Sequence, residues 1–268
     1  MLVSATAFAA GVLFPRPLHL VRQIEDPISR KTSTIHEYCA GNQIITVSGS
    51  RVVIADYDRQ QLTEIDRQAN TYSVTRFEEI AKATPKQATA SAKSADGTAN
   101  GNANGAPEWK STSLGMKSST ANRSVAAYEL TRESAGEKQK LNVGLDPKVM
   151  LSRDAIEVLI GAAWPNPRGV HHDAVLNAAG GARDGRAPRV RTEGDTAGGA
   201  TYALPVEQSL TIDVAGESLT MRSSIISVTS ELPSPDVTAI PPGLELVESR
   251  LTRAARELRE LDQLPPRQ

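Results

Sequence analysis

Short apolar–polar alternation dominates residues 42–77. The alternating runs are separated by tight polar turns at Gly49-Ser50, at residues 58–61 and at residues 66–70. Period-two alternation is typical of half-buried strands, and short polar turns join neighbouring strands into antiparallel hairpins. A two-residue loop that begins with glycine suits a type II′ turn, because its first residue needs a positive φ. The pattern therefore predicts an antiparallel meander at the centre of the fold.

The same alternation recurs on both sides of the meander. It predicts further strands at residues 17–25, 32–39, 125–130, 139–143, 202–214 and 219–229. In the first of these, Leu18, Leu20, Arg22 and Ile24 share one face, because successive side chains of a strand point to opposite sides. Turn sequences at residues 26–29, 134–137 and 215–218 join these strands into hairpins.

Helical spacing appears at three places. Thr75 and Glu78 have the spacing of a capping box, and Pro85 ends the helix that follows. Ser152 caps a second helix, with Asp154 in its first turn and apolar residues from Ala155 onward at three- and four-residue spacing. Residues 244–264 are predicted to form an amphipathic helix with mixed charges. We expect it to pack on its own domain, with a membrane-surface or partner-binding role as the alternatives.

Two long stretches are poor in apolar residues. Residues 84–122 consist mainly of Ala, Ser, Thr, Gly, Asn and Lys, and residues 165–200 are rich in glycine. Such composition cannot repay the entropy of ordering, so both are predicted to be flexible. Closing a loop of that length costs only about 2 kcal/mol more than closing a five-residue loop. Residues 17–248 are therefore predicted to form one domain that the two segments interrupt. The predicted fold class is α+β, a curved, open antiparallel sheet (a half-barrel) packed over a few helices.

The charge balance and the N-terminal sequence indicate which partners and which compartment to expect. The chain has 30 basic and 31 acidic residues, for a formal net charge of −1, which argues against an electrostatic nucleic-acid binder. No segment reaches the ~20 apolar residues of a membrane span. Residues 1–16 begin with a short apolar run that contains Ala7-Phe8-Ala9, a small-x-small pattern. We interpret them as the remnant of a secretion signal, with a plain flexible terminus as the alternative, and expect an extracytoplasmic protein.

Candidate chemistry is sparse. His19 and His36 lie on neighbouring predicted strands and can face one another, and residues 171–173 read His-His-Asp. Neither group has the spaced Cys and His ligands of a metal site, so no metal or cofactor is predicted. Cys39 is the single cysteine and cannot form an internal disulfide. No nucleophile elbow or phosphate loop is present, which makes an enzyme the third of three hypotheses.

Parts of the chain resemble a family of secreted bacterial proteins of uncharacterised function. The likeness rests on residues 53–58 (VIADYD), 62–66 (LTEID), 70–75 (NTYSVT) and 77–79 (FEE), and on the ending at 225–228 (IISV) and 240–243 (IPPG). This group is similar to the LolA/LolB-type lipoprotein carriers. The resemblance covers residues 18–248 without the two flexible segments, and it implies an open sheet wrapped over helices around an apolar cavity.

The leading hypothesis is a non-enzymatic, extracytoplasmic binding protein for a hydrophobic ligand, such as a lipid or a lipoprotein. Its affinity would come from the burial of apolar surface. The side chains expected to line the cavity are Phe77, Ile156, Leu159, Ile160 and Trp164. The alternative is a structural or interaction module of the cell envelope that binds another protein through the C-terminal helix.

Overall fold

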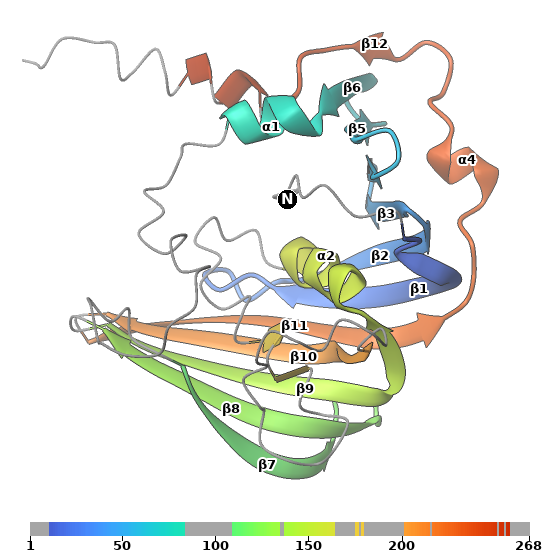
Figure 1. The fold of residues 1–268 in the computed structure, drawn as a ribbon. Coiled ribbons are helices and arrows are strands. Elements are labelled where there is room, and N and C mark those ends of the chain that lie inside the picture. Colours follow the sequence, from blue (N-terminus) through green and yellow to red (C-terminus); the bar gives the residue numbers. More distant parts are fainter. Residues whose placement is uncertain are drawn as a thin grey trace, which may run out of the picture.

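A single sheet organises the protein. The computed structural model describes residues 11–83, 109–134, 137–163, 175–176, 178–179, 201–214, 216–250, 252–254 and 256–257. In this part of the chain twelve strands form one open sheet, in the order β12-β6-β5-β4-β3-β2-β1-β11-β10-β9-β8-β7 (Figure 1). The strands are β1 (Phe14–Glu25), β2 (Thr32–Gly41), β3 (Gln43–Ser48), β4 (Arg51–Asp56), β5 (Gln61–Asp66), β6 (Thr71–Arg76), β7 (Lys110–Ser118), β8 (Ser124–Ser134), β9 (Glu137–Ser152), β10 (Thr201–Val214), β11 (Glu217–Thr229) and β12 (Glu245–Leu246).

The predicted meander is confirmed. Strands β2 to β6 follow one another as antiparallel neighbours, and Gly49 has a φ of 58°, as its place in the turn requires. The two longer turns end on Gln60 and Asn70, each with a φ of 53°. Asparagine enters this left-handed region more readily than most residues do.

The N-terminal and C-terminal halves of the sheet meet at β1. This strand pairs with β2 on one side and with β11, about 200 residues later, on the other. Strands β11, β10, β9 and β8 then continue the sheet by antiparallel pairing, and β7 forms its edge. At the other edge β12 pairs with β6 in parallel, over two residue pairs.

Three of the short helices that accompany the sheet have both ends within the described residues. They are α1 (Phe77–Ala83), α2 (Arg153–Ala163) and α4 (Pro235–Thr238). Ser152 caps α2 as predicted, since its hydroxyl accepts the Ala155 N–H at 3.2 Å. The cap of α1 lies one residue later than predicted, because the carboxylate of Glu79 accepts the Arg76 N–H.

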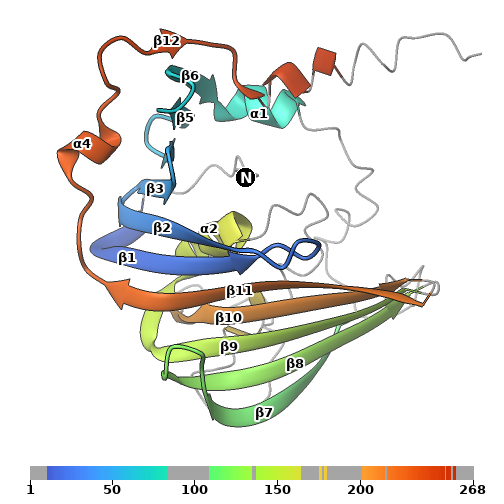
Figure 2. The same ribbon diagram turned by 180° about the vertical axis from the view of Figure 1, so that it is seen from behind.

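The main core lies between the sheet and α2, which sits on the concave side of the sheet in Figures 1 and 2. Side chains from β1, β3, β5 and β8 to β11 join one apolar cluster with the buried face of α2. Leu20, Leu141 and Ile156 are among its fully buried members. A second, smaller cluster of Ile45, Val52 and Ile65 lies on the outer face of the meander. Val237 and Leu244, from the segment that carries α4 to β12, pack against it.

The predicted α+β class is wrong. The described chain is largely β, a twelve-stranded open sheet with short helices, and not a layer of helices under a half-barrel. Fragments were predicted where long strands form. The fragment at 139–143, for example, belongs to the 16-residue β9, which continues through polar residues that alternate only weakly. Because the strands are longer than the predicted fragments, the helical share of the described chain is smaller than predicted.

The structure also differs from three of the predicted segment boundaries. The segment 84–122 contains β7, and residues 84–108 lie outside the described residues. An edge strand pairs on one side, so it forms here without an apolar face. Within 165–200, Val175, Leu176, Ala178 and Ala179 are helical and buried in the main core. The predicted helix 244–264 begins later, because residues 245–246 form β12 and helical residues start at 250.

The prediction of a signal remnant falls mainly on residues 1–10, which lie outside the described residues. Leu13 and Phe14 of the predicted signal remnant 1–16 are buried in the main core, where Phe14 begins β1. Among the helices of the described residues, none has the length and apolar character needed to cross a membrane.

Candidate functional site

A cavity of about 460 Å³ lies on the outer face of β8 to β11 and β1. Strand pairing places two neighbouring rows of side chains on this face. One row runs across Ala127, Gly144, Glu207, Ser224 and Gln23, and the next runs across Glu129, Asn142, Ser209, Arg222 and Glu25. All of these except Glu129 line the cavity. The volume is within the range of small-molecule sites.

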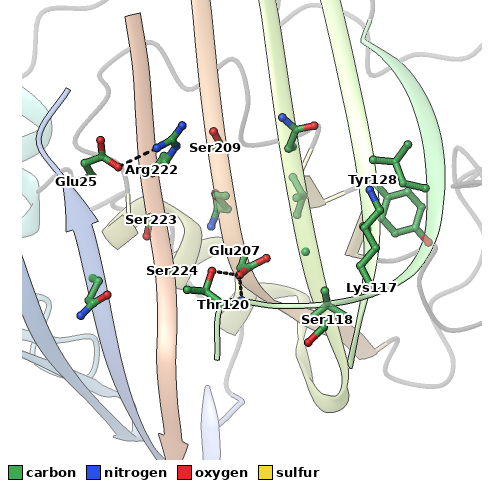
Figure 3. Close-up of a pocket in the computed structure, with 18 of the residues that line it drawn as sticks. Glu25, Lys117, Ser118, Thr120, Tyr128, Glu207, Ser209, Arg222, Ser223 and Ser224 are labelled. Carbon is green, nitrogen blue, oxygen red and sulfur yellow. Dashed lines mark hydrogen bonds and ion pairs between the residues drawn. The ribbon is translucent and has the colours of Figure 1, made fainter. Parts of the chain in front are cut away.

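Glu207 is the central charged group of the cavity (Figure 3). One of its carboxylate oxygens, Oε1, accepts the Thr120 backbone N–H at 2.5 Å and the Thr120 hydroxyl at 2.6 Å. The other oxygen, Oε2, lies over Gly144, only 3.4 Å from where a Cβ of that residue would stand. Gly144 therefore leaves the space that the Glu207 side chain occupies.

The turn between β7 and β8 forms one wall, and two contacts hold it against the sheet. Thr120 binds Glu207 on β10, and the Arg123 guanidinium pairs with the buried Asp146 carboxylate on β9 at 2.9 Å. Within the turn, the Ser119 hydroxyl accepts the Arg123 N–H. The wall is thus fixed to the strands that form the floor of the cavity.

The charged groups on opposite sides of the cavity differ in their partners. Arg222 pairs with Glu25 at 3.3 Å, and Glu25 also binds Arg30 at 3.1 Å. Lys117, near the fixed turn in Figure 3, makes no hydrogen bond or ion pair with the described residues. The lining charges are therefore two carboxylates and two cations, which balance.

Several polar side chains of the cavity have unused hydrogen-bonding capacity. Among the described residues no partner is found for the side chains of Gln23, Asn142, Ser209 and Ser224, all of which are half-buried. The apolar residues of the lining include Leu114, Val125, Ala127 and Tyr128. Burial raises the pKa of Tyr128, so its hydroxyl stays protonated at neutral pH.

The predicted ligand-binding residues lie elsewhere. Phe77, Ile156, Leu159 and Ile160 are buried in the main core and do not line the cavity on the outer face. Trp164 lies outside the described residues. The ring of Phe77 meets the ring of Tyr57 edge-on at a centroid distance of 5.4 Å. In the described structure these side chains fill the interior.

The two histidines do face one another, as predicted. His19 Nε2 lies 3.1 Å from His36 Nδ1, and the His19 ring stacks on Tyr38 at 4.1 Å. Burial, and then the neighbouring His36, lower the pKa of His19, while Glu231 at 3.4 Å acts in the opposite direction. The described residues contain no cluster of three His, Cys, Asp or Glu side chains able to hold a metal. Residues 171–173 are not described.

A buried ion pair lies in the sheet beside these groups. The Arg22 guanidinium bonds to Glu37 through Nε at 3.0 Å and Nη2 at 2.9 Å, and its Nη1 donates to the Ser223 hydroxyl. Cys39, the next residue on the same face of β2, is buried, and desolvation raises the pKa of its thiol. The contacts of Arg22 with Glu37 and Ser223 connect β1 to β2 and to β11.

Sequence reasoning missed the cavity. Its residues are ordinary polar positions on the outer face of strands, and their alternation gives no signal that a turn covers them. Thr120 lies within the segment 84–122 that was predicted to be flexible. The one local hint is Gly144, which directly follows the predicted strand 139–143 and lies inside β9, since a strand glycine often marks a close approach.

No protein-family model and no curated protein matches the chain. Among solved structures the chain is similar to PNGF-II in the C2 and P21 space groups, with TM-scores of 0.35 and 0.37 and sequence identities of 9% and 10%. The match covers 90% of this chain and 33% of the PNGF-II chain in each case. Likeness at this level carries no conclusion about fold or function. The resemblance to LolA/LolB-type carriers is untested by these comparisons and stays a prediction.

Proposed function

We propose that this chain is a non-enzymatic binding protein and that its ligand is a small hydrophilic molecule held in the cavity on the outer face of β8 to β11. The observation that carries the proposal is the set of half-buried polar side chains there that have no partner among the described residues. A half-buried polar group needs a hydrogen bond from water or from a ligand. The ligand would replace water at these groups.

The cavity also needs little rearrangement to bind. Its floor is a sheet and its wall is a turn fixed at both Glu207 and Asp146. A pre-formed site avoids part of the entropy cost of ordering on binding. Its lining residues include no histidine or cysteine among those described, so what it offers is hydrogen bonding and shape.

A thermal-shift screen of water-soluble metabolites tests the proposal, followed by calorimetry on the hits. Asn142→Trp fills the cavity and should abolish binding. Lys138→Trp, on the same strand and face but outside the cavity, should leave it unchanged. Hits that bind both variants equally, or a screen without hits, would refute the proposal.

The hydrophobic-ligand hypothesis remains as a second candidate. It is supported by the apolar concave face and by α2 packed on it, but it requires Ile156, Leu159 and Ile160 to leave the core when the ligand binds. Organic extraction of the purified protein and mass spectrometry test it. A lipid recovered in stoichiometric amount would favour this candidate over the hydrophilic site.

A further inference from the structure

Resting on the proposed function, we infer that the ligand of the outer-face cavity is a short neutral carbohydrate. The inference depends on three properties of the cavity: balanced charge, neighbouring donors and acceptors, and a wall that is partly carbon. Each property excludes a different class of hydrophilic ligand.

Charge balance disfavours ions. Glu25 and Glu207 face Lys117 and Arg222, so the lining has no net charge. Both carboxylates already accept hydrogen bonds from the protein, Glu25 from two arginines and Glu207 from Thr120. A ligand with a net charge would be desolvated here without a surplus of opposite charge to compensate it.

The polar side chains of the cavity that have no partner among the described residues favour a ligand that both donates and accepts hydrogen bonds. The amides of Gln23 and Asn142 each offer a donor and an acceptor, and so do the hydroxyls of Ser209 and Ser224. These residues lie on four neighbouring strands, which are spaced roughly 5 Å apart. A ligand that reaches several of them needs hydroxyl-like groups at short intervals.

Glu207 adds a specific requirement. Its Oε1 is bound by Thr120, and its Oε2, over Gly144, has no partner among the described residues. A carboxylate oxygen accepts only, so the ligand must present a donor at this point. A sugar hydroxyl does so, whereas a carboxylate or phosphate would be repelled.

The carbon part of the wall matches the remaining surface of a sugar. Leu114 on β7 and Val125 and Ala127 on β8 are apolar residues of the cavity lining. Sugar rings carry C–H groups beside their hydroxyls, and burying those C–H groups against apolar side chains is favourable. A purely polar ligand would leave these apolar side chains unused.

Calorimetry on the full chain tests the inference with named probes. Maltose, cellobiose and N,N′-diacetylchitobiose represent neutral carbohydrates, while L-glutamine, citrate and spermidine represent zwitterions, anions and cations. We expect at least one disaccharide to bind. Asn142→Leu and Glu207→Gln should each weaken it at least tenfold, and Lys138→Leu, four residues along the same face, should leave it unchanged. Circular dichroism checks that each variant is folded.

The outcomes separate the inference from the proposed function. If a charged or zwitterionic probe binds and Asn142→Leu weakens it, while no disaccharide binds, the carbohydrate inference is overturned and the hydrophilic site stands. Disaccharide binding that survives both cavity variants also overturns the inference, because the site would lie elsewhere. Absence of binding by all six probes would overturn the inference and count against the proposed function.

Discussion

Replacing Glu37 with glutamine removes one charge from an ion pair that water does not reach. The side chains of Arg22 and Glu37 are both 2% exposed, and the guanidinium makes two contacts to the same carboxylate oxygen. The substitution keeps the size of the side chain and leaves the Arg22 charge buried without its counter-ion. The pair joins β1 to β2, and through Ser223 it also joins β11, at the point where the two halves of the sheet meet.

The expected cost is large. Breaking a buried pair by removing one partner typically costs about 3–5 kcal/mol. Native domains have a free energy of unfolding of about 5–15 kcal/mol, so the variant would lose about a fifth of its stability or more. In a domain of about 150–250 residues this corresponds to a fall in Tm of roughly 6–20 °C.

Urea-induced unfolding, followed by far-ultraviolet circular dichroism at pH 7, measures the loss. Glu129→Gln is the matched control, because Glu129 pairs with Lys140 across β8 and β9 where both side chains are about a third exposed or more. An exposed pair is worth about 0.2–1 kcal/mol, so the control should differ little from the wild type.

A double variant distinguishes a buried unpaired charge from lost packing. Arg22→Met with Glu37→Leu removes both charges and keeps the volume, so it should be more stable than Glu37→Gln. Two results would refute the reasoning: a loss below about 1 kcal/mol for Glu37→Gln, or a double variant as unstable as the single one.

Three further predictions concern other contacts. Gly144→Ala places a Cβ 3.2 Å from Glu207 Cβ and 3.3 Å from Val125 Cγ2, so it should cost about 1–3 kcal/mol in urea unfolding; unchanged stability would contradict the close approach. The pKa of His19 is lowered in the folded protein, so the unfolded chain binds more protons as pH falls through about 6.5, and stability should fall with it. His19→Gln should flatten that slope in chemical unfolding between pH 7.5 and 5.5, and an unchanged slope would show that another group causes it. Leu159→Ala should cost about 2–5 kcal/mol but leave cavity binding intact once the protein is folded, and selective loss of binding in calorimetry would favour a ligand beside α2.

Local patterns predicted β1 to β6, β10 and β11, because the alternation of a strand is a local property of the sequence. Arg22 shows both the reach of that reasoning and its limit. Alternation placed it with Leu18 and Leu20, and the structure does bury it on that face. Its counter-ion Glu37 and its neighbour Ser223 come from other strands, one of them 201 residues away. Pairing between distant strands leaves no mark in the period of either strand.

The prediction of a helical layer was wrong, and the cavity on the outer face was not predicted, for related reasons. Apolar spacing in 155–163 predicted α2 correctly, but burial of Ile156 and Leu159 in a filled core cannot be distinguished from a cavity lining by sequence. Strand β7 was not predicted because its composition is polar, and an edge strand tolerates lysine, serine and threonine. The cavity exists because Thr120 and Arg123 fix a turn over a polar face, a tertiary contact that hydropathy does not encode.

Hydrogen–deuterium exchange, read by mass spectrometry with and without the tightest-binding probe, tests most directly on which face of the sheet the ligand lies. Binding at the proposed site predicts slower exchange in the segments 118–124, 140–146, 205–210 and 222–225, with no change in α2. Protection concentrated in α1 and α2, with none in the strands that line the cavity, would contradict it.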